Sequence, residues 1–122
     1  LLGMQAEPAA PGESHLTLDL KPEHCNLLPA AHGGVIMTLL DVAMARAAIG
    51  APGAGAGAVV TVEMSSRFLH PGRGPLQARG RALKVGGSLC TCEAQVLQAD
   101  GTVVATAQGT FKYWRGPLGG IE

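Results

Sequence analysis

The segment from His32 to Ile49 constrains the fold most, because it is a nearly unbroken apolar run with the length of a helix. Asp41 is the only acid in this run and the only one between Glu23 and Glu63. Its neighbours one helical turn away carry no positive charge that could neutralise it. A helix that is apolar on every side is predicted to be buried, and a lone buried carboxylate is costly. Asp41 is therefore predicted to face a cavity that admits water and substrate, or to pair with a group from elsewhere in the fold.

Strand patterns lie on both sides of this helix. Leucines alternate with polar residues over 14–20, which predicts a half-buried strand. After the helix, four segments rich in β-forming residues are separated by glycine, proline or the Asp100-Gly101 hairpin pair. These segments are 59–68, 76–85, 88–98 and 102–114. The order predicts an α+β fold, in which a curved antiparallel sheet wraps around one long central helix. We expect residues 1–13 to be a flexible N-terminal segment and residues 14–122 to form a single domain.

Composition and charge narrow the possible partners and the compartment. The chain has 122 residues and a formal net charge of zero, so nothing global points to nucleic acid or to an anionic membrane. Polar residues interrupt the longest apolar stretch before it reaches the length of a membrane span. The first residues lack the basic and apolar regions of a signal peptide. Three cysteines do not make a disulfide framework, and we therefore expect a cytoplasmic protein.

The start of the helix offers a second chemical feature. His32, Gly33 and Gly34 open the helix, where backbone N–H groups have no partner within the helix and the dipole is positive. The glycines allow a ligand to approach that backbone closely. This end of the helix is predicted to bind an anion or to stabilise an oxyanion.

The spacing between Gly33 and Asp41 predicts how many chains the site needs. The two residues are eight positions apart, which is about 12 Å of helical rise. A general base must lie within about 3 Å of the attacking water, and that water must reach the carbonyl that the N–H donors polarise. One helix cannot supply both groups to one bond. We therefore predict a homodimer with two shared sites, in which the two helices pack antiparallel about a two-fold axis.

The residues also match a known family. Asn26, the run from His32 to Gly34 and Asp41, followed by Val60–Met64 at the start of a strand, have a combined spacing typical of one enzyme class. The chain resembles hotdog-fold acyl-CoA thioesterases of the phenylacetic-acid-degradation and human thioesterase superfamily-member-2 type. The resemblance implies hydrolysis of an acyl-CoA thioester without metal or other cofactor. It also implies a dimer of hotdogs that commonly pairs again into a homotetramer.

The resemblance assigns roles by position. Asp41 matches the catalytic acid, which acts as general base or as nucleophile, and Gly33 matches the backbone donor to the thioester oxygen. Asn26 and His32 match residues that surround and orient the thioester. Thr61 occupies the place of a serine that helps to hold the water in the human-type enzymes. Each residue also has a structural interpretation, and for Asp41 this is a buried acid bonded to backbone or to a partner subunit.

Arg73 and Lys84 are candidates for binding the phosphates of CoA, since phosphates favour such donors. Gly86, Gly87 and Ser88 resemble the family's turn near these phosphates, although the same residues suit an ordinary hairpin. Solvated sheet faces also carry arginines and lysines, so the structural interpretation stays open for each of them.

Two further expectations concern the pocket and the rival functions. The acyl pocket should lie between subunits and be lined by apolar residues such as Met37, Leu40 and Met64. The four histidines have no metal-ligand spacing, and Cys90 and Cys92 have the spacing of small core residues. The alternative function is a non-catalytic acyl-CoA-binding hotdog module, which would keep the fold without needing the acid.

Overall fold

The structure is a computed structural model that describes residues 3–25 and 30–117. Asn26 lies outside the described residues. In chain order, the elements are β1 (Gln5–Glu7), β2 (Glu13–Leu18), a short 3-10 helix (Pro22–His24), α1 (Gly33–Ile49), β3 (Val59–Phe68), β4 (Leu76–Val85), β5 (Leu89–Gln98) and β6 (Val103–Tyr113).

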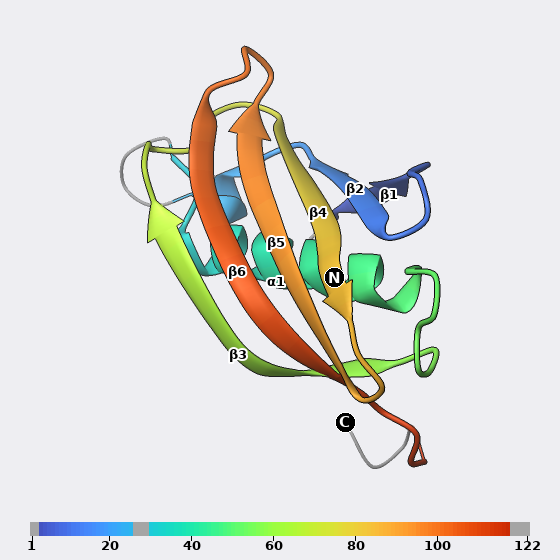
Figure 1. The fold of residues 1–122 in the computed structure, drawn as a ribbon. Helices are drawn as coiled ribbons and strands as arrows, with labels where there is room; N and C mark the ends of the chain where they lie inside the picture. Colours follow the sequence, from blue (N-terminus) through green and yellow to red (C-terminus); the bar gives the residue numbers. More distant parts are fainter. Residues whose placement is uncertain (1–2, 26–29, 118–122) are drawn as a thin grey trace.

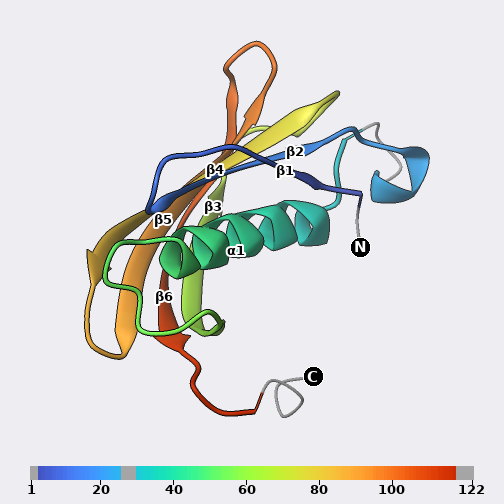
Figure 2. The ribbon, with the colours of Figure 1, turned by 90° about the vertical axis from the view of Figure 1, so that its right-hand side faces the viewer.

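The strands form one antiparallel sheet in the order β1-β2-β4-β5-β6-β3. The sheet curves around α1, with β3 at one edge and β1 at the other (Figure 1). Seen from the side, the helix lies along the concave face of the sheet (Figure 2). This confirms the predicted α+β hotdog arrangement. The helix and the five longer strands agree with the predicted ranges to within one or two residues. The sequence patterns do not predict β1, a short exposed strand within residues 1–13.

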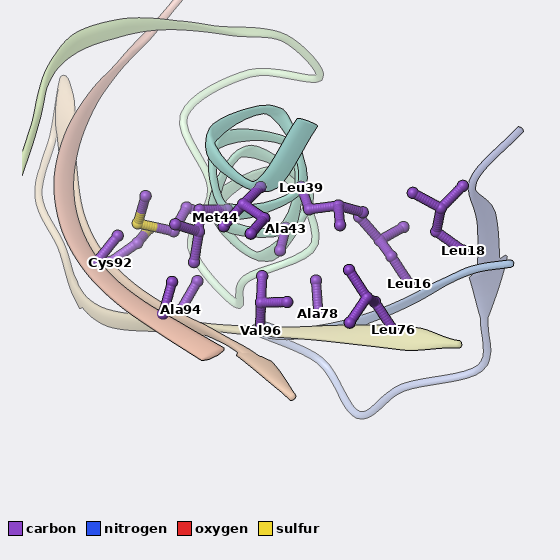
Figure 3. Close-up of a cluster of buried hydrophobic side chains, with 14 of the residues drawn as sticks. Leu16, Leu18, Leu39, Ala43, Met44, Leu76, Ala78, Cys92, Ala94 and Val96 are labelled. Atoms are coloured by element: carbon purple, nitrogen blue, oxygen red, sulfur yellow. The ribbon is translucent and has the colours of Figure 1, made fainter. Parts of the chain in front are cut away.

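The core fixes the helix tightly onto the sheet. Leu39, Ala43 and Met44 point from α1 toward small and branched side chains of β4 and β5 (Figure 3). Gly80 of β4 lies directly beneath the helix, where any Cβ would overlap the carbonyl of Ala43. The hydroxyl of Ser14 donates a hydrogen bond to that same carbonyl. The backbone of α1 therefore approaches the sheet more closely than bulkier residues would permit.

The C-terminal half of the helix is hydrogen-bonded to β6. The buried hydroxyl of Tyr113 donates a 2.8 Å hydrogen bond to the carbonyl oxygen of Ala48. Because the helix is held near Ala43 and again near Ala48, its position relative to the strands is rigid.

One face of α1 and the outer edge of β3 remain uncovered within one chain. None of the ten residues of β3 is buried, and its outer edge has no neighbouring strand among the described residues. Met37, Val62 and Phe68 are 42%, 56% and 49% exposed. The prediction of a helix buried on every side is therefore only half right, because the sheet of a single chain covers only one side of it.

Candidate functional site

Asp41 and Thr61 form a hydrogen-bonded pair on the open face of the molecule. The hydroxyl Oγ1 of Thr61 donates to Oδ1 of Asp41 over 2.8 Å, which joins the helix to β3. The pairing of β3 with β6 shifts between Thr61 and Glu63, and Val62 is the extra residue of this β-bulge. Bulges re-aim side chains relative to the regular strand. We call Asp41 and Thr61 the acid pair, and it meets the prediction that the acid pairs with a group from elsewhere in the fold.

The start of α1 forms a second region, which we call the glycine end and define as His32, Gly33, Gly34 and Phe68. Gly33 and Gly34 are exposed, and the first N–H groups of a helix have no partner inside it. A Cβ added to Gly33 would lie 3.5 Å from Cε2 of Phe68, so the aromatic ring lies beside this glycine. The glycine end therefore combines backbone donors with an exposed aromatic surface.

The backbone of His32 forms hydrogen bonds on both sides of the start of α1. Its carbonyl oxygen accepts the N–H groups of Val35 and Ile36, while its own N–H donates to the carbonyl oxygen of His24 over 2.8 Å. Its imidazole makes no capping hydrogen bond and the residue is exposed. His32 is thus available to a ligand at the helix start, and its backbone helps to hold the entry of the chain into α1.

The two regions do not meet within one chain. Gly33 and Asp41 lie on one rigid helix, about 12 Å apart along its axis. Thr61 and Phe68 lie near opposite ends of β3. The structure therefore brings Asp41 together with Thr61, and His32 together with Gly33, but keeps these two groups separate. The acid pair can activate a water molecule, and the glycine end can polarise a carbonyl oxygen.

The predicted lining of the acyl pocket needs one correction. Met37 is exposed and Met64 is half-buried, so both can border a pocket outside the chain. Leu40 is fully buried because it faces the sheet, where it belongs to the hydrophobic core. Leu40 therefore cannot line a pocket between subunits.

The candidate CoA-binding residues fall into two separate places. Lys84 is exposed near the end of β4, close in sequence to the turn formed by Gly86, Gly87 and Ser88. Arg73 precedes the start of β4, and its backbone N–H donates to Oε1 of Gln98. A strand of ten residues spans about 33 Å, so β4 separates Arg73 from the other candidates.

Two basic residues that the sequence analysis missed lie near this turn. Nη2 of Arg115 donates to the carbonyl oxygen of Gly87 over 3.1 Å. Lys112 is paired with Leu89, the first residue of β5 after the turn. The Asp100-Gly101 hairpin signal fixes the pairing of β5 with β6, so it contained the information needed to find Lys112.

Two of the three cysteines are core residues. Cys90 and Cys92 are fully buried, with their sulfur atoms 3.7 Å apart. Burial, together with the hydrogen bond to Cys90, raises the pKa of Cys92 to about 12. The Cys92 thiol is therefore neutral near neutral pH and is not a nucleophile.

Within residues 3–25 and 30–117, no group of three or more His, Cys, Asp or Glu side chains is arranged to hold a metal ion. No helix in this described part is long and apolar enough to cross a membrane.

Comparison with known sequences identifies the family. The model of the Thioesterase superfamily matches residues 28–105. The chain belongs to this superfamily. A protein of Halobacterium salinarum, whose name suggests an esterase, is 32% identical over 93% of this chain and 82% of its own length. The family predicted from the motif is therefore confirmed.

Solved structures of this superfamily have the same fold. A thioesterase family protein from Silicibacter pomeroyi is 28% identical, with a TM-score of 0.85 over 94% of this chain and 87% of that one. The Escherichia coli PaaI protein from the phenylacetic acid degradation operon also has a TM-score of 0.85, over 94% of this chain and 82% of that one. At 23% identity, the similarity to PaaI establishes the fold alone.

Proposed function

We propose that this thioesterase superfamily member hydrolyses acyl-CoA thioesters at two sites, each shared between two copies of the chain. The observation that carries the proposal is the hydrogen bond between Asp41 and Thr61, 2.8 Å long, on the open face that also presents the glycine end. The acid pair of one copy faces the glycine end of the other. This arrangement unites a base and an oxyanion site that one helix separates by about 12 Å.

The reaction follows from these two regions. The carbonyl oxygen of the thioester accepts a hydrogen bond from the backbone N–H of Gly33. Asp41 of the second copy removes a proton from a water molecule, which attacks the carbonyl carbon. Thr61 bonds one carboxylate oxygen and so orients Asp41, leaving the other oxygen for the water. The tetrahedral intermediate collapses by breaking the carbon–sulfur bond, and the CoA thiolate receives the proton.

A thioester suits a site with a single carboxylate. Its carbonyl carbon is electrophilic, and a thiolate is a far better leaving group than an amide nitrogen or an alkoxide. The reaction therefore needs a base and an oxyanion donor, but little acid assistance to the leaving group. This explains why the site works without a nucleophile–histidine–acid triad.

The exposed edge of β3 supports the dimer. This strand has an unpaired edge within the described chain and exposes the apolar side chain of Val62, and a second copy would cover both. Two antiparallel copies of β3 can bring Thr61 of one copy beside Phe68 of the other only in one narrow range of registers. In that range, the two-fold axis passes close to Met64 and Ser65.

For the nucleotide end of CoA, we propose the turn after β4. Lys84 and Gly86–Ser88 lie at this end, and Lys112 and Arg115 add two positive charges near them. Arg73 is about one strand length away and would have to act on the CoA of a different site. If the assignment is correct, Lys84→Ala raises the KM for acyl-CoA more than it lowers kcat. Arg73→Ala leaves the KM unchanged unless Arg73 contacts the CoA of a different site.

The decisive experiment measures release of free CoA from a panel of aryl-CoA and fatty-acyl-CoA thioesters. Asp41→Asn should lower kcat by about 10²–10⁴-fold while the dimer persists, because the amide cannot accept the proton of the water. Asp19→Asn, which alters an exposed acid elsewhere, is the matched control. Full turnover by Asp41→Asn would refute the mechanism. Tight binding of acyl-CoA without release would favour the alternative, a non-catalytic binding module.

A further inference from the structure

The aromatic ring at the glycine end has no structural task in the core of one chain. Phe68 is the last residue of β3 and about half of it is exposed, while most apolar side chains of the neighbouring strand β6 are buried. Its ring lies beside Gly33, where an added Cβ would come within 3.5 Å of Cε2. An exposed phenyl ring at this place is expected to contact an apolar group of a bound molecule.

The position of the ring relative to the N–H of Gly33 defines what it touches. In the proposed reaction, the thioester oxygen lies about 2.9 Å from the nitrogen of Gly33. Because the ring is in contact range of the same residue, the carbonyl carbon and its two substituents are placed to come near the ring. One of these substituents is the acyl group and the other is the sulfur of the pantetheine arm.

The chemistry of the surroundings favours the acyl group. The pantetheine arm contains two amides that require hydrogen-bond partners wherever they are removed from water. The hydroxyl of Thr38, on the same part of the helix, already donates to the carbonyl oxygen of Gly34 over 2.8 Å. Its one proton is therefore not free for an amide carbonyl of this arm. Met37 lies one turn after Gly33 and exposes its thioether chain. Phe68 and Met37 thus present apolar surface at the glycine end.

We infer that Phe68 is a specificity-determining residue, whose ring forms the wall of the acyl pocket beside the thioester and selects apolar acyl groups over short or charged ones. This inference rests on the proposed thioesterase function and extends it to the substrate class. Aromatic and straight-chain acyl groups gain contact with the ring, whereas an acetyl group is too short to use it. A succinyl group would bring a carboxylate against an apolar wall at a desolvation cost.

The test compares kcat/KM for acetyl-, hexanoyl-, phenylacetyl- and succinyl-CoA in the wild type, Phe68→Ala and Phe68→Leu. Phe68→Ala should lower kcat/KM for the hexanoyl and phenylacetyl substrates by about tenfold or more, and for acetyl-CoA by about twofold at most. Phe68→Leu should restore much of the loss for hexanoyl-CoA. Ile49→Ala, which removes an exposed apolar side chain at the opposite end of the same helix, is the matched control and should leave all four values unchanged.

The outcomes separate this inference from the function on which it rests. If the wild type releases CoA but Phe68→Ala changes kcat/KM for all four substrates equally or not at all, the role of Phe68 in the acyl pocket is refuted and the thioesterase function stands. An elution volume equal to that of the wild type shows that Phe68→Ala has kept its assembly. If the wild type releases CoA from none of the substrates, the proposed function is refuted, and so is the role of Phe68 in the acyl pocket.

Discussion

The acid pair and the glycine end occupy the same open face of one helix, yet they consist of different chemical groups. The acid pair consists of two polar side chains, joined by a hydrogen bond that links α1 to a bulged strand. The glycine end consists of exposed backbone beside a phenyl ring. One region can remove a proton and the other can bind a developing negative charge. Under the proposed function, each copy of the chain therefore carries two incomplete halves of a site.

The fold holds these halves apart. Gly80 and Ser14 hold the middle of the helix against the sheet at Ala43, and Tyr113 bonds to Ala48 nearer its end. A helix fixed at both places cannot bend to close a gap of about 12 Å without breaking the packed core. In the proposed mechanism, a second copy of the chain supplies the acid pair that faces each glycine end.

At the glycine end, the largest effect should come from Gly33→Pro. Proline is well tolerated at the first residue of a helix, and His32 has φ −58° and ψ 144°, which suits the residue before a proline. The change deletes the N–H donor and should lower kcat for acetyl-CoA by about 10²–10³-fold. Gly33→Ala keeps the donor and should stay close to wild type with this small substrate. Equal losses in both variants would mean that shape, rather than the N–H group, makes the glycine end important.

A smaller effect is expected at the acid pair from Thr61→Val. Valine keeps the shape of threonine but cannot donate to Oδ1 of Asp41, so the carboxylate loses its orienting bond. We expect kcat to fall by about tenfold, which corresponds to one hydrogen bond to a charged group of about 1.5 kcal/mol. Thr61→Ser retains the hydroxyl and should recover most of the activity. A Thr61→Val enzyme with unchanged kcat would show that Asp41 is oriented by other contacts.

The smallest effect on activity should come from Ser65→Cys, which tests how the two regions face each other. Ser65 is exposed on β3, close to the proposed two-fold axis. Under mild oxidation, we expect this variant to form a covalent dimer on a non-reducing gel. Gln95→Cys, on the exposed face of the interior strand β5, is the control and should remain monomeric under the same denaturing conditions. Cross-linking of the control but not of Ser65→Cys would place the interface elsewhere.

The sequence predicts the elements of the fold well because their signals are local. The apolar run from His32 to Ile49 and the alternating strands have the periodicities of their structures, and the Asp100-Gly101 pair marks the β5–β6 hairpin. Asp41 and Gly33 also stand out locally, as a lone acid and as a glycine at a helix start. Their separation follows from helix geometry alone.

Tertiary contacts are what the sequence does not reveal. The bond between Thr61 and Asp41 depends on a bulge whose position has no clear local signal, and the contact of Phe68 with Gly33 depends on how β3 crosses the helix. The prediction that Leu40 lines the pocket is wrong because a run that is apolar on every side does not indicate which side faces the sheet. The separation of Arg73 from Lys84, by contrast, follows from the predicted strand 76–85, whose bounds are those of β4.

Subunit mixing tests the shared site most directly. Asp41→Asn and Gly33→Pro are each expected to inactivate both sites of their own homodimer. Co-expressed or co-refolded in equal amounts, they form mixed dimers in which one of the two sites joins an intact Asp41 to an intact Gly33. Random pairing should restore about a quarter of the wild-type activity. If the mixed protein is no more active than the two variants alone while mixed dimers are present, Asp41 and Gly33 do not act together across two copies and the account is wrong.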